Sequence, residues 1–478
     1  MIKSSSYERN YFIFLSATFI TSLVAAIISS YYWLLAIPFL ILFVYAAWQQ
    51  WQFVFFILIL SLPWSVEYSF NSSLGTDLPD EPLMLLTSGL LIARFFYKPS
   101  EAFDRWKHPL MLLLCICVGW IIATVPFSTD WLVSLKFLLA KSWYILAFVL
   151  APLIIFNDKN SIRTTALAFL ISMLCVVVIV LCKHAGSAFT FIGINEAVSP
   201  FFRNHVNYSA MLVCAMPVLI ACYQLNKKYR LLILLMMTVV VTAVFFSYAR
   251  GAWMALLIGL ISYWLIKRQK LLFAFVVSFI LILASVFWLS RNDRYLHYQN
   301  DYRTTIFHTN FEEHLVATYE LKDVSTAERF YRWIAGVRMI KYNWLTGYGP
   351  NTFYNNYKPN ASPAFKTWVS DNKDHSTVHN YFLLITIEQG IPGLLFFLLL
   401  TAAMLYYSEG LYKKIADKFY KTVALTCGVM LMMILTVNFL SDLIETDKVG
   451  SLFFLCLATL IAIDRNTKGE REKVSIDK

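Results

Sequence analysis

The sequence predicts an all-α polytopic membrane protein, with about 12 to 14 transmembrane helices and one large, mainly helical periplasmic loop. Of its 478 residues, 59% are hydrophobic and only 14% are charged, against about a quarter charged in an average soluble domain. The charges are bunched between apolar runs of about 17 to 24 residues, and such a run can cross a hydrocarbon core of about 30 Å. Most of these runs have no polar face, which excludes a large soluble helical core.

Fourteen apolar segments are the expected membrane spans. Their approximate ranges are 11–29, 31–47, 52–69, 82–97, 109–125, 132–155, 162–182, 206–224, 230–248, 251–266, 271–289, 381–406, 420–440 and 449–463. The first two are nearly fused, so we expect twelve to fourteen spans. The first segment follows a short head that contains Lys3 and Arg9 but lacks a small-residue cleavage site, and we therefore expect a membrane helix rather than a signal peptide.

The positions of lysine and arginine predict the orientation of the chain. With the N-terminus in the cytoplasm, the cytoplasmic segments receive the basic C-terminal tail and Arg94, Lys98, Arg105, Lys107, Lys159, Arg163, Lys227, Lys228, Arg230, Lys267, Arg268, Lys270, Lys413, Lys414, Lys418 and Lys421. The short loops on the other side carry mainly acids: Glu67, Asp77, Asp80, Glu81, Asp130, Glu196, Asp442, Glu445 and Asp447. We therefore expect a bacterial inner-membrane protein with both termini in the cytoplasm. The net charge of +11 then needs no nucleic-acid partner.

One long segment, 290–380, remains on the periplasmic side. It is rich in Tyr, Asn, Asp, Arg and His, and it has too many aromatic residues for a disordered segment. Because long loops in compact proteins are usually either functional or disordered, we place the candidate site there. The chain then divides into a first membrane part (1–289), this loop (290–380), the last three spans (381–463) and a cytoplasmic tail (464–478).

No metal or other cofactor is expected. The eight cysteines fall inside the predicted spans or at their edges, which disfavours a disulfide framework and a cysteine metal site. His375 and His379 have the spacing of two zinc ligands on one helical face. However, Ser376 stands where a zinc protease has its glutamate, which argues against a zinc site.

Arg250 lies in a turn, 247–251, between two spans, on the side of the membrane where lone basic residues are scarce. One interpretation is an arginine that snorkels to lipid headgroups. The other is a phosphate-binding residue, because the planar guanidinium binds phosphate oxygens in pairs. A lipid-linked diphosphate would place its phosphates at this depth in the membrane.

The loop offers a second group of arginines. If its middle is helical, Arg329, Arg332 and Trp333 share a face, and Arg338 follows on the same helix. This group is either a solvated basic helix or the source of a second phosphate-binding arginine. A later turn at 347–353, with two glycines and a proline, is expected to fold the loop back over the membrane.

His379 directly precedes a span, and Lys141 lies within one. The imidazole of His379 is either a capping or packing group or a general base that takes a proton from a hydroxyl. Charges within a span are costly and usually face a cavity, so Lys141 is a candidate for lining one. Lys136 lies nearer the outer end of the same span and can snorkel. The further candidates for this cavity, on a shorter external loop, are His184, Asn204, His205 and Asn207.

Four elements together resemble the bacterial O-antigen ligase/O-antigen polymerase superfamily of integral-membrane proteins. His379-Asn380, nine further residues and Gly390-Ile391-Pro392-Gly393 resemble its signature. The turn from Ser247 to Gly251 resembles its arginine at the membrane boundary, and Arg329-x-x-x-Trp333 and Gly347-Tyr348-Gly349 resemble the middle of its periplasmic loop. These elements occur in order between about 200 and 400, whereas the amino-terminal half matches only in hydropathy.

The resemblance implies a GT-C-like, metal-independent, inverting glycosyltransferase. Its donor would be a glycan on undecaprenyl diphosphate, and its acceptor a hydroxyl of lipid A-core, a protein or another glycan. Arg250 and Arg329 would bind the diphosphate and stabilise it as it leaves, and His379 would activate or position the acceptor. Arg332 competes with Arg329 for the second role. Further expected contacts with substrate are Arg338, Asn380, Lys141 and His375.

Within the superfamily, a ligase is favoured over an O-antigen or exopolysaccharide polymerase. Typical polymerases have two dominant external loops, and the 183–205 loop here is short. A transporter or flippase of lipid-linked sugars is the main alternative from another class, and it would not depend on His379. A non-catalytic scaffold, with Arg250, Arg329 and His379 scattered in space, is the third. The expected partners are the donor, a glycolipid, glycan or protein acceptor, and membrane lipids.

Overall fold

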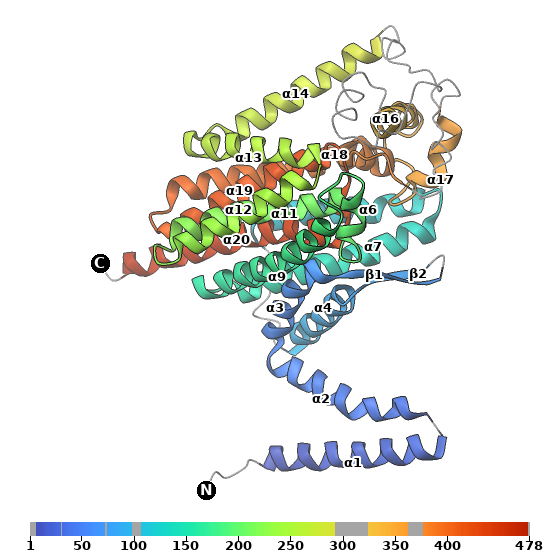
Figure 1. The fold of residues 1–478 in the computed structure, drawn as a ribbon, viewed down its shortest axis with the longest axis vertical. Helices are drawn as coiled ribbons and strands as arrows, with labels where there is room; N and C mark the ends of the chain where they lie inside the picture. The colour runs from blue at the N-terminus through green and yellow to red at the C-terminus, as the bar shows by residue number, and fades with distance from the viewer. Residues whose placement is uncertain are drawn as a thin grey trace.

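The computed structural model describes residues 6–29, 31–71, 74–97, 107–291, 324–361 and 376–476. These ranges are almost entirely helical (Figure 1). The first helices are α1 (Ser6–Ser29), α2 (Ala36–Gln49), α3 (Trp51–Ser61), α4 (Asp80–Tyr97), α6 (Pro109–Thr124), α7 (Trp131–Ile145), α8 (Ala151–Ile155), α9 (Lys159–Gly186), α10 (Gly193–Val198) and α11 (His205–Leu225). The later ones are α12 (Arg230–Phe246), α13 (Arg250–Arg268), α14 (Leu271–Ser290), α16 (Val324–Tyr342), α17 (Phe353–Tyr357), α18 (Tyr381–Lys414), α19 (Lys418–Asn438) and α20 (Asp447–Ile476).

The helices confirm the predicted class of an all-α polytopic membrane protein. Among the described residues, seven helical segments are long and apolar enough to cross a membrane, and an eighth counts if α2 and α3, bent by 102°, form one span. The other predicted spans fall on helices that do not meet both limits, so the number of twelve to fourteen remains a prediction.

The prediction of a helical span over 52–69 was wrong at its end. Helix α3 stops at Ser61, and Val66–Asn71 forms strand β1, which pairs antiparallel with β2 (Leu74–Leu78). The reason is visible in the sequence, since apolar or aromatic residues alternate with polar ones from Val66 to Asn71, as in a strand with one exposed face. The resulting hairpin lies beside α4 and α7 (Figure 1).

Helix α19 lies at the centre of the bundle, with α11, α13, α18 and α20 packed around it. In the apolar stretches of α11 and α19, 72% of residues are buried, whereas only 6% are buried in α14, which lies at the edge. Gly259 and Gly428 permit close approaches between helices: a Cβ at Gly259 would lie 1.9 Å from a Met433 side-chain atom, and one at Gly428 would lie 2.2 Å from Oγ of Ser408. Helices α1 and α2 stand apart from the bundle (Figure 1).

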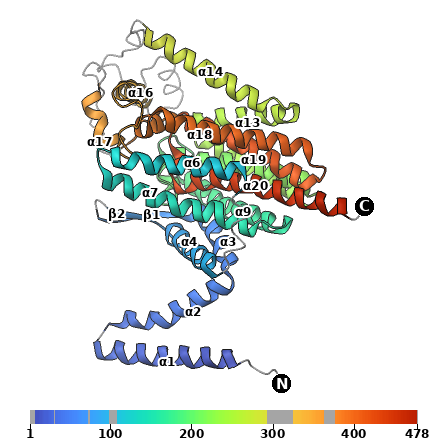
Figure 2. The same ribbon diagram turned by 180° about the vertical axis from the view of Figure 1, so that it is seen from behind.

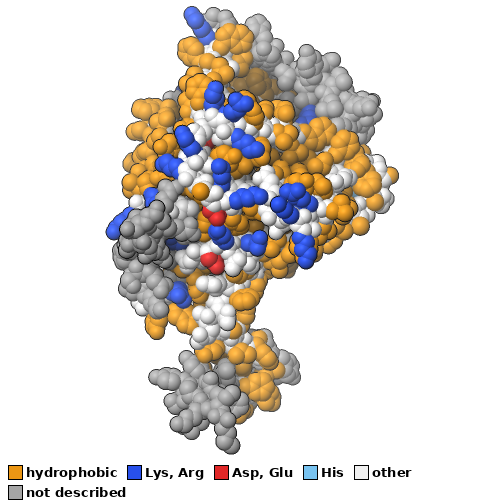
Figure 3. Space-filling view, turned by 90° about the vertical axis from the view of Figure 1, so that its left-hand side faces the viewer, with side chains coloured by type: hydrophobic (Ala, Val, Ile, Leu, Met, Phe, Trp, Pro, Cys, Tyr) orange, Lys and Arg blue, Asp and Glu red, His pale blue; other side chains and the backbone are white. Residues whose placement is uncertain are grey.

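The two ends of the bundle differ. The hairpin, α16, α17 and the start of α18 lie at one end, which we call the loop end (Figure 2). Helix α20 finishes at the other, where lysine and arginine side chains gather on the surface, and we call this the basic end (Figure 3). The described helices contribute Lys159 at the start of α9, Arg230 at the start of α12, Lys267 and Arg268 at the end of α13, and Lys413 and Lys414 at the end of α18.

Candidate functional site

The loop end is built around a break in α18. Gly390 has φ 72°, and a Cβ there would lie 2.1 Å from the carbonyl oxygen of Leu345. The turn that follows α16 is docked at this break, where the N–H of Ile391 donates to the Trp344 carbonyl at 2.8 Å and the N–H of Tyr348 donates to the Ile387 carbonyl at 3.0 Å. Glycine is required at the break because only glycine adopts this backbone freely.

Buried Glu388 fastens the same turn. Its two carboxylate oxygens accept hydrogen bonds from the N–H groups of Asn351 (2.8 Å) and Phe353 (3.1 Å), and its backbone carbonyl accepts one from Gly349 (2.9 Å). Within α16, which precedes this turn, a Cβ at Gly336 would lie 2.7 Å from Cδ1 of Ile387. Helix α16 therefore crosses α18 at close range. Gly390 of the signature, together with Glu388, therefore holds the external segment against the helix that begins after His379.

Helix α16 also fixes the backbone immediately before His379. Nη1 of Arg332 donates to the Thr377 carbonyl at 2.9 Å, and Nε1 of Trp333 donates to the Val378 carbonyl at 3.0 Å. Two consecutive side chains of α16 thus hold two consecutive carbonyls. His379 itself has φ 51°, a left-handed conformation that is unusual for a non-glycine residue.

Asp442, in the connection between α19 and α20, also lies near His379. Its Oδ2 accepts a hydrogen bond from Oγ1 of Thr377 at 2.7 Å, and its Oδ1 lies 3.9 Å from Nδ1 of His379. Burial raises the pKa of the Asp442 carboxyl. The sequence placed Asp442 among the external acids but did not single it out, because no local motif marks it.

The His379 imidazole is neutral at physiological pH. Its side chain is 34% exposed and therefore accessible. Burial of the rest of the ring, followed by the charges of Arg329 and Arg332, lowers the pKa of His379 to about 3. Both arginines therefore act electrostatically on the histidine.

The two arginines have different surroundings. Arg332 is 6% exposed, and besides its bond to Thr377 its Nε lies 3.5 Å from Oε2 of Glu328, which is 7% exposed. Arg329 is half-buried on the adjoining part of the helix. Arg332 is thus held by internal partners, Glu328 and the Thr377 carbonyl.

Arg250 begins α13 at the same end of the bundle. The residue before the cap, Tyr248, has φ 56°, and its hydroxyl donates to the Phe189 carbonyl at 2.6 Å, which fixes the turn. A Cβ on Gly251 would lie 3.9 Å from Cδ1 of Leu440, two residues before Asp442 in the chain. The turn that carries Arg250 therefore lies against the connection that approaches His379.

The remaining candidates have structural partners or lie elsewhere. Asn380 is buried and caps α18, its Oδ1 accepting from the Leu383 N–H at 3.0 Å. Arg338 is half-buried on α16, and His375 lies outside the described residues. These positions favour a capping role for Asn380 over direct contact with a substrate.

Lys141 is paired inside the bundle. Its Nζ lies 2.7 Å from Oε2 of Glu445, and both residues line a cavity of only about 50 Å³ together with Tyr381 and Gln389. None of His184, Asn204, His205 and Asn207 lines this cavity, which is too small for a sugar. On the shorter loop, His184 is buried with Nε2 2.9 Å from the Thr190 carbonyl oxygen.

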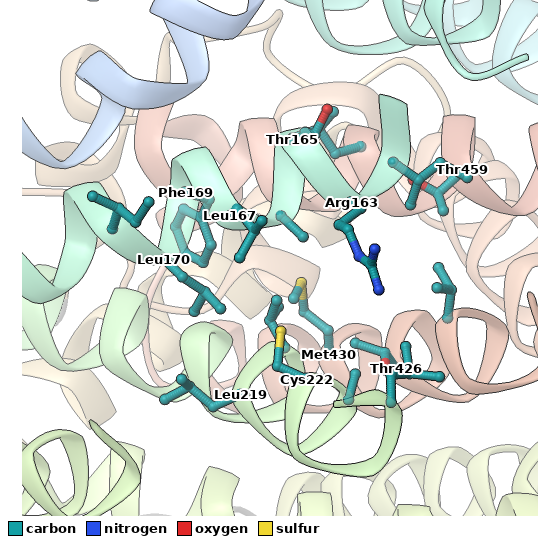
Figure 4. Close-up of a pocket in the computed structure, with 18 of the residues that line it drawn as sticks. Arg163, Thr165, Leu167, Phe169, Leu170, Leu219, Cys222, Thr426, Met430 and Thr459 are labelled. Atoms are coloured by element: carbon teal, nitrogen blue, oxygen red, sulfur yellow. The ribbon is translucent and has the colours of Figure 1, made fainter. Parts of the chain in front are cut away.

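An apolar cavity of about 580 Å³ lies towards the basic end, between α9, α11, α12, α19 and α20 (Figure 4). Phe169, Leu170, Leu219 and Met430 line it, and the Arg163 side chain lies at its edge. Arg163 follows the start of α9, next to the beginning of α19, whereas His379 precedes the start of α18 at the opposite end. This cavity is therefore separate from the histidine site.

The fold and the site define a multi-pass helical membrane protein in which one end of the bundle holds a neutral histidine between arginines and an aspartate. A sequence profile of the O-antigen ligase family matches residues 232–398, and this match supports the similarity of the chain to the O-antigen ligase/polymerase superfamily. The matched third of the chain contains Arg250, Arg329 and His379 but not Lys141. The superfamily implies a glycosyltransferase-type enzyme that uses lipid-linked glycans. No curated protein matches the chain.

Proposed function

We propose that the protein is an O-antigen ligase-like glycosyltransferase, which moves a glycan from an undecaprenyl-diphosphate carrier to an acceptor hydroxyl at the periplasmic face of the inner membrane. The observation that carries this proposal is the arrangement at His379: a neutral, accessible imidazole with Asp442 on one side and two arginines on the other. The family match covers these elements except Asp442. The gathering of lysine and arginine at the opposite end supports a periplasmic position for the loop end.

In the proposed reaction, Arg250 and Arg329 bind the diphosphate of the donor. The acceptor oxygen attacks the anomeric carbon and gives its proton to Nε2 of His379, since Nδ1 faces Asp442. The bond between the anomeric carbon and the diphosphate oxygen breaks, and the carrier leaves with the electron pair. Attack opposite to the leaving group inverts the anomeric carbon, and the arginines stabilise the charge that develops on the diphosphate.

The arginines also give the donor a role in activating the base. Without an anion, their charges contribute to a pKa of about 3 for His379, which makes a weak base. A bound diphosphate would offset these charges and raise the pKa of His379 towards neutrality. The histidine would then take a proton readily only when the donor is in place.

The short external segment between α9 and α11 supports a ligase over a polymerase, because it holds only the six-residue helix α10 beside its turns. We therefore propose a ligase. The acceptor class distinguishes the two enzymes in an assay, since a polymerase would use a second lipid-linked glycan as the acceptor.

The test is transfer by the purified protein in liposomes that contain a lipid-linked glycan and a panel of acceptors. His379→Ala should lower transfer by about 100-fold or more, as expected for loss of a general base. The matched control is His108→Asn at the basic end, where His108 accepts from the Leu110 N–H and asparagine can still cap α6. Undiminished transfer by a folded His379→Ala variant would rule out the proposed base.

A further inference from the structure

A second cavity lies at the loop end, which we call the hairpin cavity. It has a volume of about 600 Å³ and is bounded by the β1–β2 hairpin, the turn 199–203 and the start of α20. This volume falls within the range of about 300–1,000 Å³ that is usual for ligand sites. Its charged lining includes Glu67, Asp77, Glu81, Arg203, Glu445 and Asp447.

The hairpin cavity carries an excess of acids. Lys448 is its second basic residue, but Nζ of Lys448 donates to the backbone carbonyls of Ser65 (2.9 Å) and Phe201 and lies 4.3 Å from the centre of the Phe202 ring. The ammonium group therefore joins two walls of the cavity and lies 9% exposed. An anionic ligand would meet more carboxylates than available cations in this cavity.

Hydrogen bonds hold the acidic side chains around this cavity in fixed positions. Glu81 accepts from Oγ1 of Thr76 at 2.5 Å and ties the hairpin to α4. Behind it, Oδ1 of Asp80 accepts from Oγ of Ser65 at 2.6 Å. These bonds hold the carboxylates in place from both sides of the hairpin turn.

One buried acceptor in the lining is short of a donor. Among the described residues, Oδ2 of Asp447, which is 5% exposed, has no partner other than the neighbouring carboxyls of Asp80 and Asp77. Burial, followed by the charge of Asp447, raises the pKa of Asp77 to about 7. Buried carboxylates need donors, and a ligand rich in hydroxyl groups supplies them.

The hairpin cavity adjoins the histidine site through one short segment. Glu445 and Asp447 line the cavity, and Asp442 begins the turn that leads to them. Arg203, also in the lining, exerts an electrostatic effect on Asp442. No group of three or more His, Cys, Asp or Glu among the described residues is arranged to hold a metal ion, which disfavours a cation as the occupant.

We propose that the hairpin cavity binds the acceptor, and that the part of the acceptor held there is an uncharged, hydroxyl-rich sugar. This inference rests on the proposed transferase function. The carboxylates accept hydrogen bonds from sugar hydroxyls, and Tyr144 and Phe201 offer apolar surface for a sugar ring. Sugars that carry phosphate or carboxylate groups are repelled by the same wall. The two substrates are thus separated by charge, with the diphosphate on the arginine side and the neutral acceptor on the acid side.

The test compares a neutral trisaccharide with the same trisaccharide carrying one uronic acid. Binding is measured by saturation-transfer NMR and use as an acceptor by KM. The unaltered protein should favour the neutral sugar by at least tenfold. The pair Glu67→Gln and Asp77→Asn should reduce this preference to less than threefold, chiefly by improving use of the acidic sugar. A purely structural role for the two acids would instead weaken both sugars together.

Asp130→Asn is the matched control, because Asp130 is an acid of the loop end outside the cavity lining and asparagine can still cap α7. An unchanged preference in the Glu67/Asp77 pair would overturn the cavity proposal, even if His379→Ala abolished transfer. Binding of the neutral sugar without any transfer would instead overturn the proposed function alone. Stabilisation of the unaltered protein by Ca²⁺ or Mg²⁺ alone, lost in Asp77→Asn, would show a cation site and also overturn the proposal.

Discussion

The loop end has two sides that share one short connection yet carry opposite charge. On one side, Arg329 and Arg332 lie close to His379, and the turn of Arg250 packs against the same connection. On the other, the hairpin cavity is lined mainly by acids. Two substrates that meet at one bond must bind side by side without exchanging places. Opposite charges on the two sides would give each substrate only one favourable position.

The largest effects are expected when Arg329 and Arg332 are replaced one at a time. Arg329→Ala should lower kcat/KM by about 100- to 1,000-fold through loss of diphosphate stabilisation. Arg332→Ala should destabilise the protein by about 3 kcal/mol, because it removes the buried contact with Glu328 and the hydrogen bond to the Thr377 carbonyl. Transfer assays and thermal unfolding of both variants check this. The reverse pattern would assign the phosphate to Arg332.

Asp442 lies in the connection that both sides share. Removing its charge is expected to have the next largest effect on catalysis. Asp442→Asn should lower kcat by about 10- to 100-fold, because the amide no longer orients the imidazole as a carboxylate does. Asn can still accept the Thr377 hydroxyl, so folding should be preserved. The measurement is kcat at saturating acceptor. A loss confined to acceptor KM would assign Asp442 to the hairpin cavity instead.

The pH dependence should differ between the free and the loaded enzyme. Because the pKa of His379 is lowered to about 3, the histidine of the free enzyme stays deprotonated from neutral pH down to about pH 4. The pH profile of kcat/KM for the donor should therefore show no decrease near pH 6.5. A bound diphosphate raises this pKa, so kcat should fall as pH drops through a higher value. Profiles of both parameters, repeated in His379→Gln, check the assignment. A shared limb near pH 6.5 that disappears in His379→Gln would contradict it.

The smallest effect on catalysis is expected at Lys141. Lys141→Met should leave Glu445 without its cation and lower the melting temperature by a few degrees, while transfer per folded molecule changes less than about threefold. Activity normalised to folded protein, measured beside thermal unfolding, separates the two effects. A loss of transfer without any loss of thermal stability would instead indicate that Lys141 contacts a substrate.

Hydropathy predicted the membrane class because long helices without a polar face are stable mainly in a lipid bilayer. The β hairpin was missed although its signal was present: the alternation from Val66 to Asn71 indicates a strand, but an adjoining apolar run concealed it. The difference between Arg329 and Arg332 could not be predicted from spacing. It is a difference in burial, and Arg332 meets the Thr377 carbonyl only because α16 crosses α18.

Asp442 illustrates a second limit. It lies more than sixty residues from His379 in the chain, and only the packing of α19 beside the start of α18 brings the two together. By contrast, the spacing from His379 to Gly390 and Gly393 is local, and its physical basis is the capped start of α18 followed by the break that receives the turn after α16. Local patterns could therefore locate half of the candidate site.

The docking of the 344–353 turn into the break of α18 also bears on how the chain can be cut. The attachment consists of hydrogen bonds from Tyr348, Gly349, Asn351 and Phe353 to Ile387 and Glu388, and none of them needs peptide continuity between the two segments. A protein expressed as two fragments, divided between 361 and 376, should reassemble at this joint. Glu388→Ala would then loosen the docked turn, while the packing of α19 against α11 and α13 keeps the two fragments together.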